Sequence, residues 1–194
     1  MAELTKKQVA AIKAVGKVCG ESPSIAPMVR YVFSDGLNVY GTNANVLLID
    51  QEIGAPKGAY FPNSAETADT MLLFAGVSLN GILTNIHGCE KENTAKSETR
   101  STFLRAKYAF DVEYEKELYQ ITFSNDGHFQ REVFFLKRTI KKVISFVGKE
   151  FSLYQNELED RCVFESKDGK RIAIVMGWYK TDGIKLLNDV DLKG

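Results

Sequence analysis

The residues best suited to bind a metal lie in residues 85–90. His87, Cys89 and Glu90 place an imidazole, a thiol and a carboxylate close together, and each of these groups is a known zinc ligand. A closed zinc site needs four ligands, and no second cluster completes this set. His128, the other histidine of the chain, follows a turn far away in the sequence. The sequence therefore favours an ordinary polar loop, and we expect neither a metal nor a cofactor.

Nucleophilic catalysis has little support from the cysteines. Cys19, Cys89 and Cys162 are widely spaced and form no C-x-x-C pair, which indicates free thiols in a reducing compartment. Cys19 falls on the apolar side of a predicted helix and Cys162 opens a predicted strand, which are ordinary buried settings. Residues 54–58 contain two glycines but lack the spacing of a phosphate-binding loop, and no Gly-x-Ser-x-Gly elbow or dinucleotide fingerprint is present. We expect a protein that is not an enzyme.

Two further groups have simpler structural explanations. Glu113 and Glu115 would share one strand face and could bind a cation, although solvated carboxylates on an exposed face are more common. Several aromatic residues of the predicted strands could stack on unpaired bases, but most such residues pack in a core. These aromatic residues are Tyr108, Phe110, Tyr114, Tyr119 and Phe123.

Basic residues on two predicted helices form the main binding candidate. Thr5 and Gln8 fit a capping box that opens a helix over residues 5–19, and a seam over residues 136–147 predicts a second helix that ends at Gly148. At 100° per residue, basic side chains gather on the non-apolar side of each helix, where they could follow DNA phosphates. Exposed lysines that only favour solubility are the open alternative. The candidate DNA contacts are Lys6, Lys13, Lys17, Lys137, Arg138, Lys141 and Lys142.

The segments between and after these two helices are predicted to be strands, because period-two patterns and turn residues recur along them. Turn residues Asp35-Gly36 and Asp168-Gly169 each separate two predicted strands. Residues 54–101 lack a regular pattern and predict an irregular insertion with a possible strand at 81–86, and the tail from Lys185 predicts a loose end. The predicted strands cover residues 28–33, 37–40, 46–49, 103–114, 117–123, 151–154, 162–165 and 171–179.

The two ends of the chain share one order of elements, namely a helix, an extended stretch, a strand, an Asp-Gly turn and a strand. Tyr31 to Gly36 and Val163 to Gly169 even share residue types. This order predicts an α+β fold built from two helix-plus-strand repeats, over about residues 4–53 and 103–179. Chance similarity between two common units is the alternative.

The chain resembles the DNA polymerase sliding clamps, the processivity factors of replication. The resemblance rests on Val9, Ile12 and Val15 in the helix, Pro27 before the strand, and Asp35-Gly36 with Thr42 after it. Residues 132–179 resemble a second half-domain. Clamps consist of repeated helix-and-strand units whose basic helices face duplex DNA, so the resemblance implies one clamp-like domain over residues 1–194. It also implies duplex DNA as a partner, and a homo-oligomer or a polymerase as protein partners.

The amino-acid composition limits the fold class and the partners that the chain can have. With 44% hydrophobic residues the chain can bury a real core, and 25 basic residues balance 25 acidic ones, so any attraction to nucleic acid must be local. No apolar run reaches the length of a membrane span, and we expect a cytoplasmic protein without a membrane partner. A small protein-interaction or scaffold protein with no nucleic-acid role is the alternative function.

Overall fold

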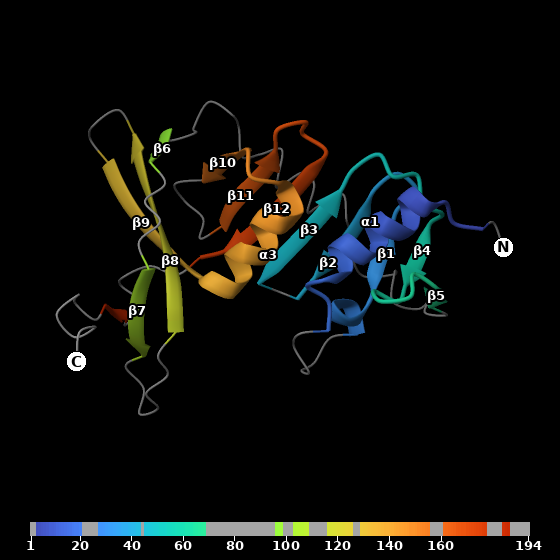
Figure 1. Cartoon of the computed structure of the whole chain (residues 1–194), viewed down its shortest axis with the longest axis horizontal. Helices are drawn as coiled ribbons and strands as arrows, with labels where there is room; N and C mark the ends of the chain where they lie inside the picture. Colours follow the sequence, from blue (N-terminus) through green and yellow to red (C-terminus); the bar gives the residue numbers. More distant parts are fainter. Residues whose placement is uncertain are drawn as a thin grey trace.

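The computed structural model describes residues 3–20, 27–43, 45–68, 96–98, 103–108, 116–125, 129–155, 161–177 and 184–186. Within these ranges the protein is α+β, with two α-helices and antiparallel strands. Figure 1 shows the chain from blue at the N-terminus to red at the C-terminus, with the helices beside one large sheet. The predicted fold class is confirmed at this level.

Eight of the described strands form the large sheet, in the order β10-β11-β12-β3-β2-β1-β4-β5. Every neighbouring pair is antiparallel. Strands from both ends of the chain therefore share one sheet. Their bounds are β1 Val32–Ser34, β2 Val39–Thr42, β3 Val46–Asp50, β4 Gly58–Tyr60, β5 Thr67–Ala68, β10 Phe151–Gln155, β11 Arg161–Ser166 and β12 Arg171–Met176.

The two halves of the large sheet join where β3 pairs with β12. Leu48 lies opposite Ala173 at the middle of this pairing, and Asp50 lies opposite Arg171 at one end. The backbone N–H of Gln51 extends the contact by donating to the Lys170 carbonyl at 2.8 Å. Residues more than one hundred positions apart in the sequence therefore form the centre of the molecule.

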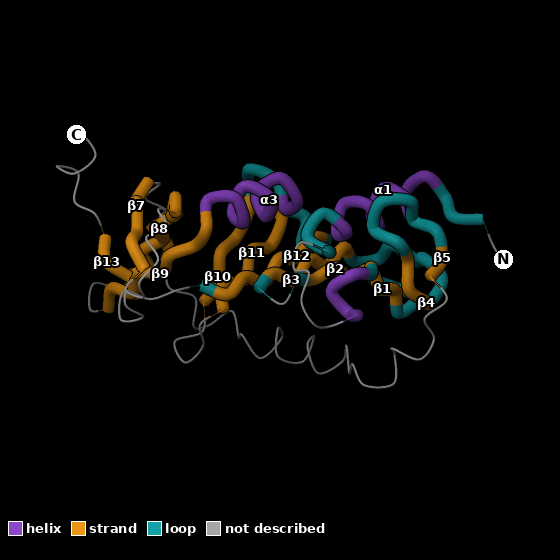
Figure 2. The backbone as a smooth tube through the Cα atoms, turned by 90° about the horizontal axis from the view of Figure 1, so that it is seen from below, coloured by secondary structure: helices purple, strands orange, loops and turns teal. Residues whose placement is uncertain are grey.

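Helices α1 (Lys6–Gly16) and α3 (Lys137–Val147) both lie on one face of the large sheet, as the edge view in Figure 2 shows. Thr5 and Gln8 form the predicted capping box, with a 2.8 Å bond from the Thr5 N–H to Gln8 Oε1. The first helix ends at Gly16 rather than at residue 19. The second ends as predicted, because Gly148 takes a positive φ of 100° and donates its N–H to the Ile144 carbonyl.

The main core lies between the helices and the sheet. Ile12 and Val15 of α1 are fully buried, as are Val143 of α3 and Phe164 of β11. Phe135, two residues before α3, packs edge-to-face on Phe164 at 6.1 Å between ring centroids. The apolar seams read from the sequence are therefore the surfaces that hold both helices on the sheet.

A glycine allows α1 to lie very close to the sheet. A Cβ on Gly41 of β2 would lie 2.3 Å from the Val15 carbonyl oxygen and 3.2 Å from Cys19 Sγ. No side chain fits in that space, so Gly41 sets the distance between the last turn of α1 and the sheet.

A second sheet has the order β13-β7-β8-β6, with β9 paired to β8. The predicted pairing of the two strands near residues 103–123 is confirmed, and residues 109–114 of the first predicted strand lie outside the described residues. Strand β9 leads directly into α3. The bounds are β6 Lys96–Glu98, β7 Phe103–Tyr108, β8 Lys116–Asn125, β9 Phe129–Leu136 and β13 Ile184–Leu186.

Several predicted elements were wrong. Residues 28–30 form part of a 3₁₀ turn, η1 (Pro27–Arg30), instead of a strand. The insertion at 54–101 is not wholly irregular, because β4 and β5 belong to the large sheet and Lys96–Glu98 is a strand. Lys185 lies in β13 rather than in a loose end. The predicted strand at 81–86 lies outside the described residues.

The two Asp-Gly turns do not occupy equivalent places. Asp35-Gly36 joins the first and second strands after α1, whereas Asp168-Gly169 joins the second and third strands after α3. Counted from each helix, the similar sequence stretches are therefore offset by one strand. Each helix is nevertheless followed by three antiparallel strands of the large sheet.

Candidate nucleic-acid interface

A direct hydrogen bond joins the two basic helices. Lys142 Nζ in α3 donates to the carbonyl oxygen of Lys17, the residue that caps the C-terminal end of α1, at 3.2 Å. Both helices lie on one face of the sheet (Figure 2), so the basic segments read separately from the sequence are neighbours in the fold.

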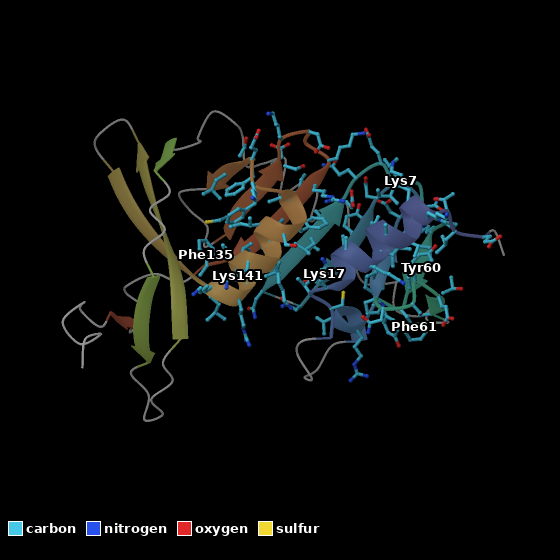
Figure 3. All side chains as sticks on the ribbon, viewed as in Figure 1. Lys7, Lys17, Tyr60, Phe61, Phe135 and Lys141 are labelled. Carbon is cyan, nitrogen blue, oxygen red and sulfur yellow. The ribbon has the colours of Figure 1, made fainter. Side chains whose placement is uncertain are left out.

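The predicted basic residues remain accessible in this arrangement. Lys137 and Lys142 are half-buried and the others are exposed, while neither helix contains an acidic residue. In Figure 3, Lys17 lies at the end of α1 nearer to α3, Lys141 lies on α3 itself, and Lys7 lies near the opposite end of α1. We call this surface the basic helix face; its residues are Lys6, Lys13, Lys17, Lys137, Arg138, Lys141 and Lys142.

Lys142 has a structural role that its sequence position did not reveal. The last carbonyl groups of a helix lack partners within the helix and carry partial negative charge. The Lys142 ammonium group therefore stabilises the end of α1 by both a hydrogen bond and its charge. It differs in this respect from Lys141, which is exposed.

A pocket lies beside the basic helix face, between the first turns of α1 and the C-terminal end of α3. Its volume is about 730 Å³. The end of β3 and the turn between β11 and β12 complete its walls. No sequence motif marks this pocket, because its lining comes from four separate segments, residues 7–11, 50–53, 147–150 and 166–171. Those that matter for its chemistry are Lys7, Asp50, Lys149, Glu150, Lys167 and Arg171.

An ion pair forms the polar floor of the pocket. Arg171 Nε lies 3.4 Å from Asp50 Oδ2, and the Asp50 side chain is only 7% exposed. Burial raises the pKa of the Asp50 carboxyl, and the opposing charges of Arg171 and Lys7 offset only part of that effect. Arg171 also donates from NH1 to the Phe146 carbonyl at 3.0 Å, and its guanidinium carbon lies 5.3 Å from the centre of the Phe146 ring.

The remaining sequence candidates give no second site. His87, Cys89, Glu90, Phe110, Glu113, Tyr114, Glu115 and His128 lie outside the described residues. Within the described part of the chain, no three His, Cys, Asp or Glu side chains are grouped as a metal site would require. Tyr108 lies in β7, and Tyr119 and Phe123 lie in β8.

Neither described cysteine has the surroundings of a nucleophile. Burial raises the pKa of the Cys19 thiol to about 11, although a backbone hydrogen bond at Thr42 acts in the opposite direction. Cys19 follows α1 instead of lying within it, and Cys162 is fully buried in β11. Residues 54–58 connect β3 to β4, and the Gly54 carbonyl accepts a hydrogen bond from Gln8 Nε2 at 2.8 Å.

Comparison with known proteins adds no relative. No protein-family model matches the chain, and no curated protein matches it significantly. Among the described residues, neither helix has the length and apolar character needed to cross a bilayer.

Proposed function

We propose that this chain is a non-enzymatic DNA-binding protein, similar to a sliding clamp or processivity factor, that contacts duplex phosphates through the basic helix face. One observation carries the proposal. Two helices without any acidic residue lie on the same face of one sheet and are joined by the Lys142–Lys17 hydrogen bond. On this proposal their lysines and arginine act as a single positive surface on a chain whose formal net charge is zero.

Such a surface suits the DNA backbone better than the base edges. Lysines on an exposed helix face neutralise phosphates at many positions without reading sequence. Each phosphate that is neutralised releases counterions, so the affinity falls steeply with salt. If four of the seven basic residues contact phosphates, the slope of log K against log salt is about −3.6.

The arrangement of strands supports the clamp-like part of the proposal. Each helix is followed by a three-stranded antiparallel meander, and the third strand of each meander pairs at the centre of the sheet. A duplicated helix-and-strand unit would give this pattern. Clamps use such units with both helices facing DNA and with sheet edges joined between subunits, so a homo-oligomer and a polymerase partner belong to the same proposal.

The test is fluorescence anisotropy of a labelled duplex at low and moderate salt. Lys13→Glu/Lys141→Glu reverses one charge on each helix and leaves the Lys142 contact intact. Arg30→Glu/Lys57→Glu is the matched control, because both residues are exposed outside the two helices and the change in net charge is identical. We expect salt-sensitive binding by the wild type and by the control, and a loss of at least tenfold in the helix variant.

Two outcomes would count against the proposal. Equal weakening by both variants would mean that net charge, and not the basic helix face, determines binding. No binding by the wild type at low salt would remove the DNA role and favour the alternative, a protein-interaction or scaffold protein whose helix lysines only aid solubility.

A further inference from the structure

The pocket beside the basic helix face has the size of a small-molecule site. Its volume of about 730 Å³ lies within the range of about 300–1,000 Å³ found for cavities that bind small organic ligands. Part of its wall is apolar, since Ala10, Ala11, Ile53 and Val147 contribute to it, and the two alanine side chains are short. Small side chains on the wall leave room for the body of a ligand.

The floor of the pocket is electrically balanced before any ligand enters. Asp50 and Arg171 neutralise one another, and the Phe146 carbonyl and ring hold the guanidinium in place. A ligand therefore meets no uncompensated charge at the bottom. Its preference for one sign of charge must come from the rim.

The rim carries an excess of positive charge. Lys167 is paired with Glu150 at 2.6 Å, and Lys170 with Glu52 at 3.1 Å. In the described structure no ion pair within 4 Å holds Lys7 or Lys149, although the charge of Lys7 also acts on the buried Asp50 carboxyl. The lining as a whole has five basic and three acidic side chains.

The helix ends do not reverse this preference. The C-terminal end of α3 carries partial negative charge, but two of its carbonyls already accept hydrogen bonds, that of Ile144 from the Gly148 N–H and that of Phe146 from Arg171. The acidic Asp168 accepts bonds from the Ser166 hydroxyl at 2.7 Å and from the Lys170 N–H at 3.1 Å. Asp168 keeps its negative charge, so Lys7, Lys149 and Asp168 together leave a net excess of one positive charge at the rim.

We propose that this pocket binds a phosphate monoester attached to a body of nucleoside size, with Lys7 and Lys149 holding the phosphate and the alanine-lined wall receiving the body. Two ammonium groups that no ion pair holds can each donate a charge-assisted hydrogen bond to the phosphate oxygens. The ligand is either a free nucleotide or the phosphorylated 5′ end of a DNA strand. This site does not depend on binding of DNA by the basic helix face.

The experiment has a small-molecule arm and a DNA arm. Calorimetry compares deoxyadenosine monophosphate with deoxyadenosine, and anisotropy compares a labelled duplex that carries a 5′-phosphate with one that carries a 5′-hydroxyl. Each is measured for the wild type, for Lys7→Gln/Lys149→Gln and for the control Arg30→Gln/Lys57→Gln. We expect the phosphate to improve binding in at least one arm by about tenfold, and this gain to vanish only in the pocket variant.

The arms separate the two ligand sources. A gain with the monophosphate identifies a free nucleotide, and a gain confined to the phosphorylated duplex identifies a DNA end. A phosphate effect in neither arm, or one that survives in Lys7→Gln/Lys149→Gln, overturns the proposal. Failure of the DNA surface is recognised separately, because only that surface requires Lys13→Glu/Lys141→Glu to weaken binding of the 5′-hydroxyl duplex.

Discussion

At the scale of single residues, Asp35 organises the turn between β1 and β2. Its Oδ1 accepts the backbone N–H groups of Leu37 and Asn38 at 2.8 and 2.7 Å, and its Oδ2 accepts the Tyr40 hydroxyl at 2.6 Å. Partial burial acts to raise the pKa of Asp35, but these hydrogen bonds together hold it below its ordinary value. The charged form of Asp35 is therefore the one that stabilises the fold.

Asp35→Asn should lower the free energy of unfolding by about 1–2 kcal/mol at pH 7, because the amide cannot accept the Tyr40 hydroxyl with the same strength. A lowered folded-state pKa gives stability that is present above the unfolded value, near 3.9, and lost as the pH falls through the folded value. Urea unfolding at several pH values should show the difference narrowing in acid. A difference that stays constant down to pH 2 would contradict this assignment.

At the scale of elements, Gly41 controls how closely α1 approaches β2. Gly41→Ala would place a methyl group 2.3 Å from the Val15 carbonyl oxygen, and the two nearest atoms belong to the Val15 backbone and cannot turn away. We expect a loss of about 1–3 kcal/mol, typical of overpacking, measured from urea unfolding midpoints. Gly58→Ala is the control, because a Cβ there meets no atom within 4 Å; equal losses in both variants would disprove the steric cause.

The contact between the helices should be visible in stability as well as in binding. Lys142→Gln weakens a charge-assisted bond to the Lys17 carbonyl and should cost about 0.5–1.5 kcal/mol. Lys141→Gln removes an exposed charge and should leave the thermal midpoint nearly unchanged. Equal midpoints for the two variants would show that the Lys142 contact adds nothing to the fold.

Local signals predicted the helices well. Thr5 with Gln8 gave the first helix start and Gly148 gave the second helix end, because capping depends on a few adjacent residues. Strand β9 was missed, since the adjacent Phe134 and Phe135 interrupt the alternation expected of a strand. The short 3₁₀ turn at Met28 was missed because Val29 and Arg30 also fit a strand.

The candidate site was only half predictable. Periodicity placed the lysines on one side of each helix, which is a property of a single helix. That α1 and α3 are neighbours depends on the order of strands in the sheet, and the sequence does not state that order. The Asp50–Arg171 ion pair has the same origin, because it follows from the register between β3 and β12.

At the scale of the whole molecule, the clamp-like proposal predicts self-association. The described strands β10 and β5 end the large sheet, and sheet edges readily pair with another chain. Light scattering at high concentration should therefore give a mass that is a multiple of 21.7 kDa. A monomer at every concentration would remove the ring version and leave the DNA surface itself to be tested by anisotropy.

The pairing of β3 with β12 also bears on how the protein is made. A ribosome completes β3 long before it reaches residue 171, so in the nascent chain β3 can pair with β2 but not with β12. Val46, Leu48 and Ile49 belong to that strand and are buried in the finished protein. Before β12 is synthesised, one backbone edge of β3 is unpaired and these apolar side chains are less well covered. We therefore expect a chain truncated before β12 to aggregate or to need a chaperone.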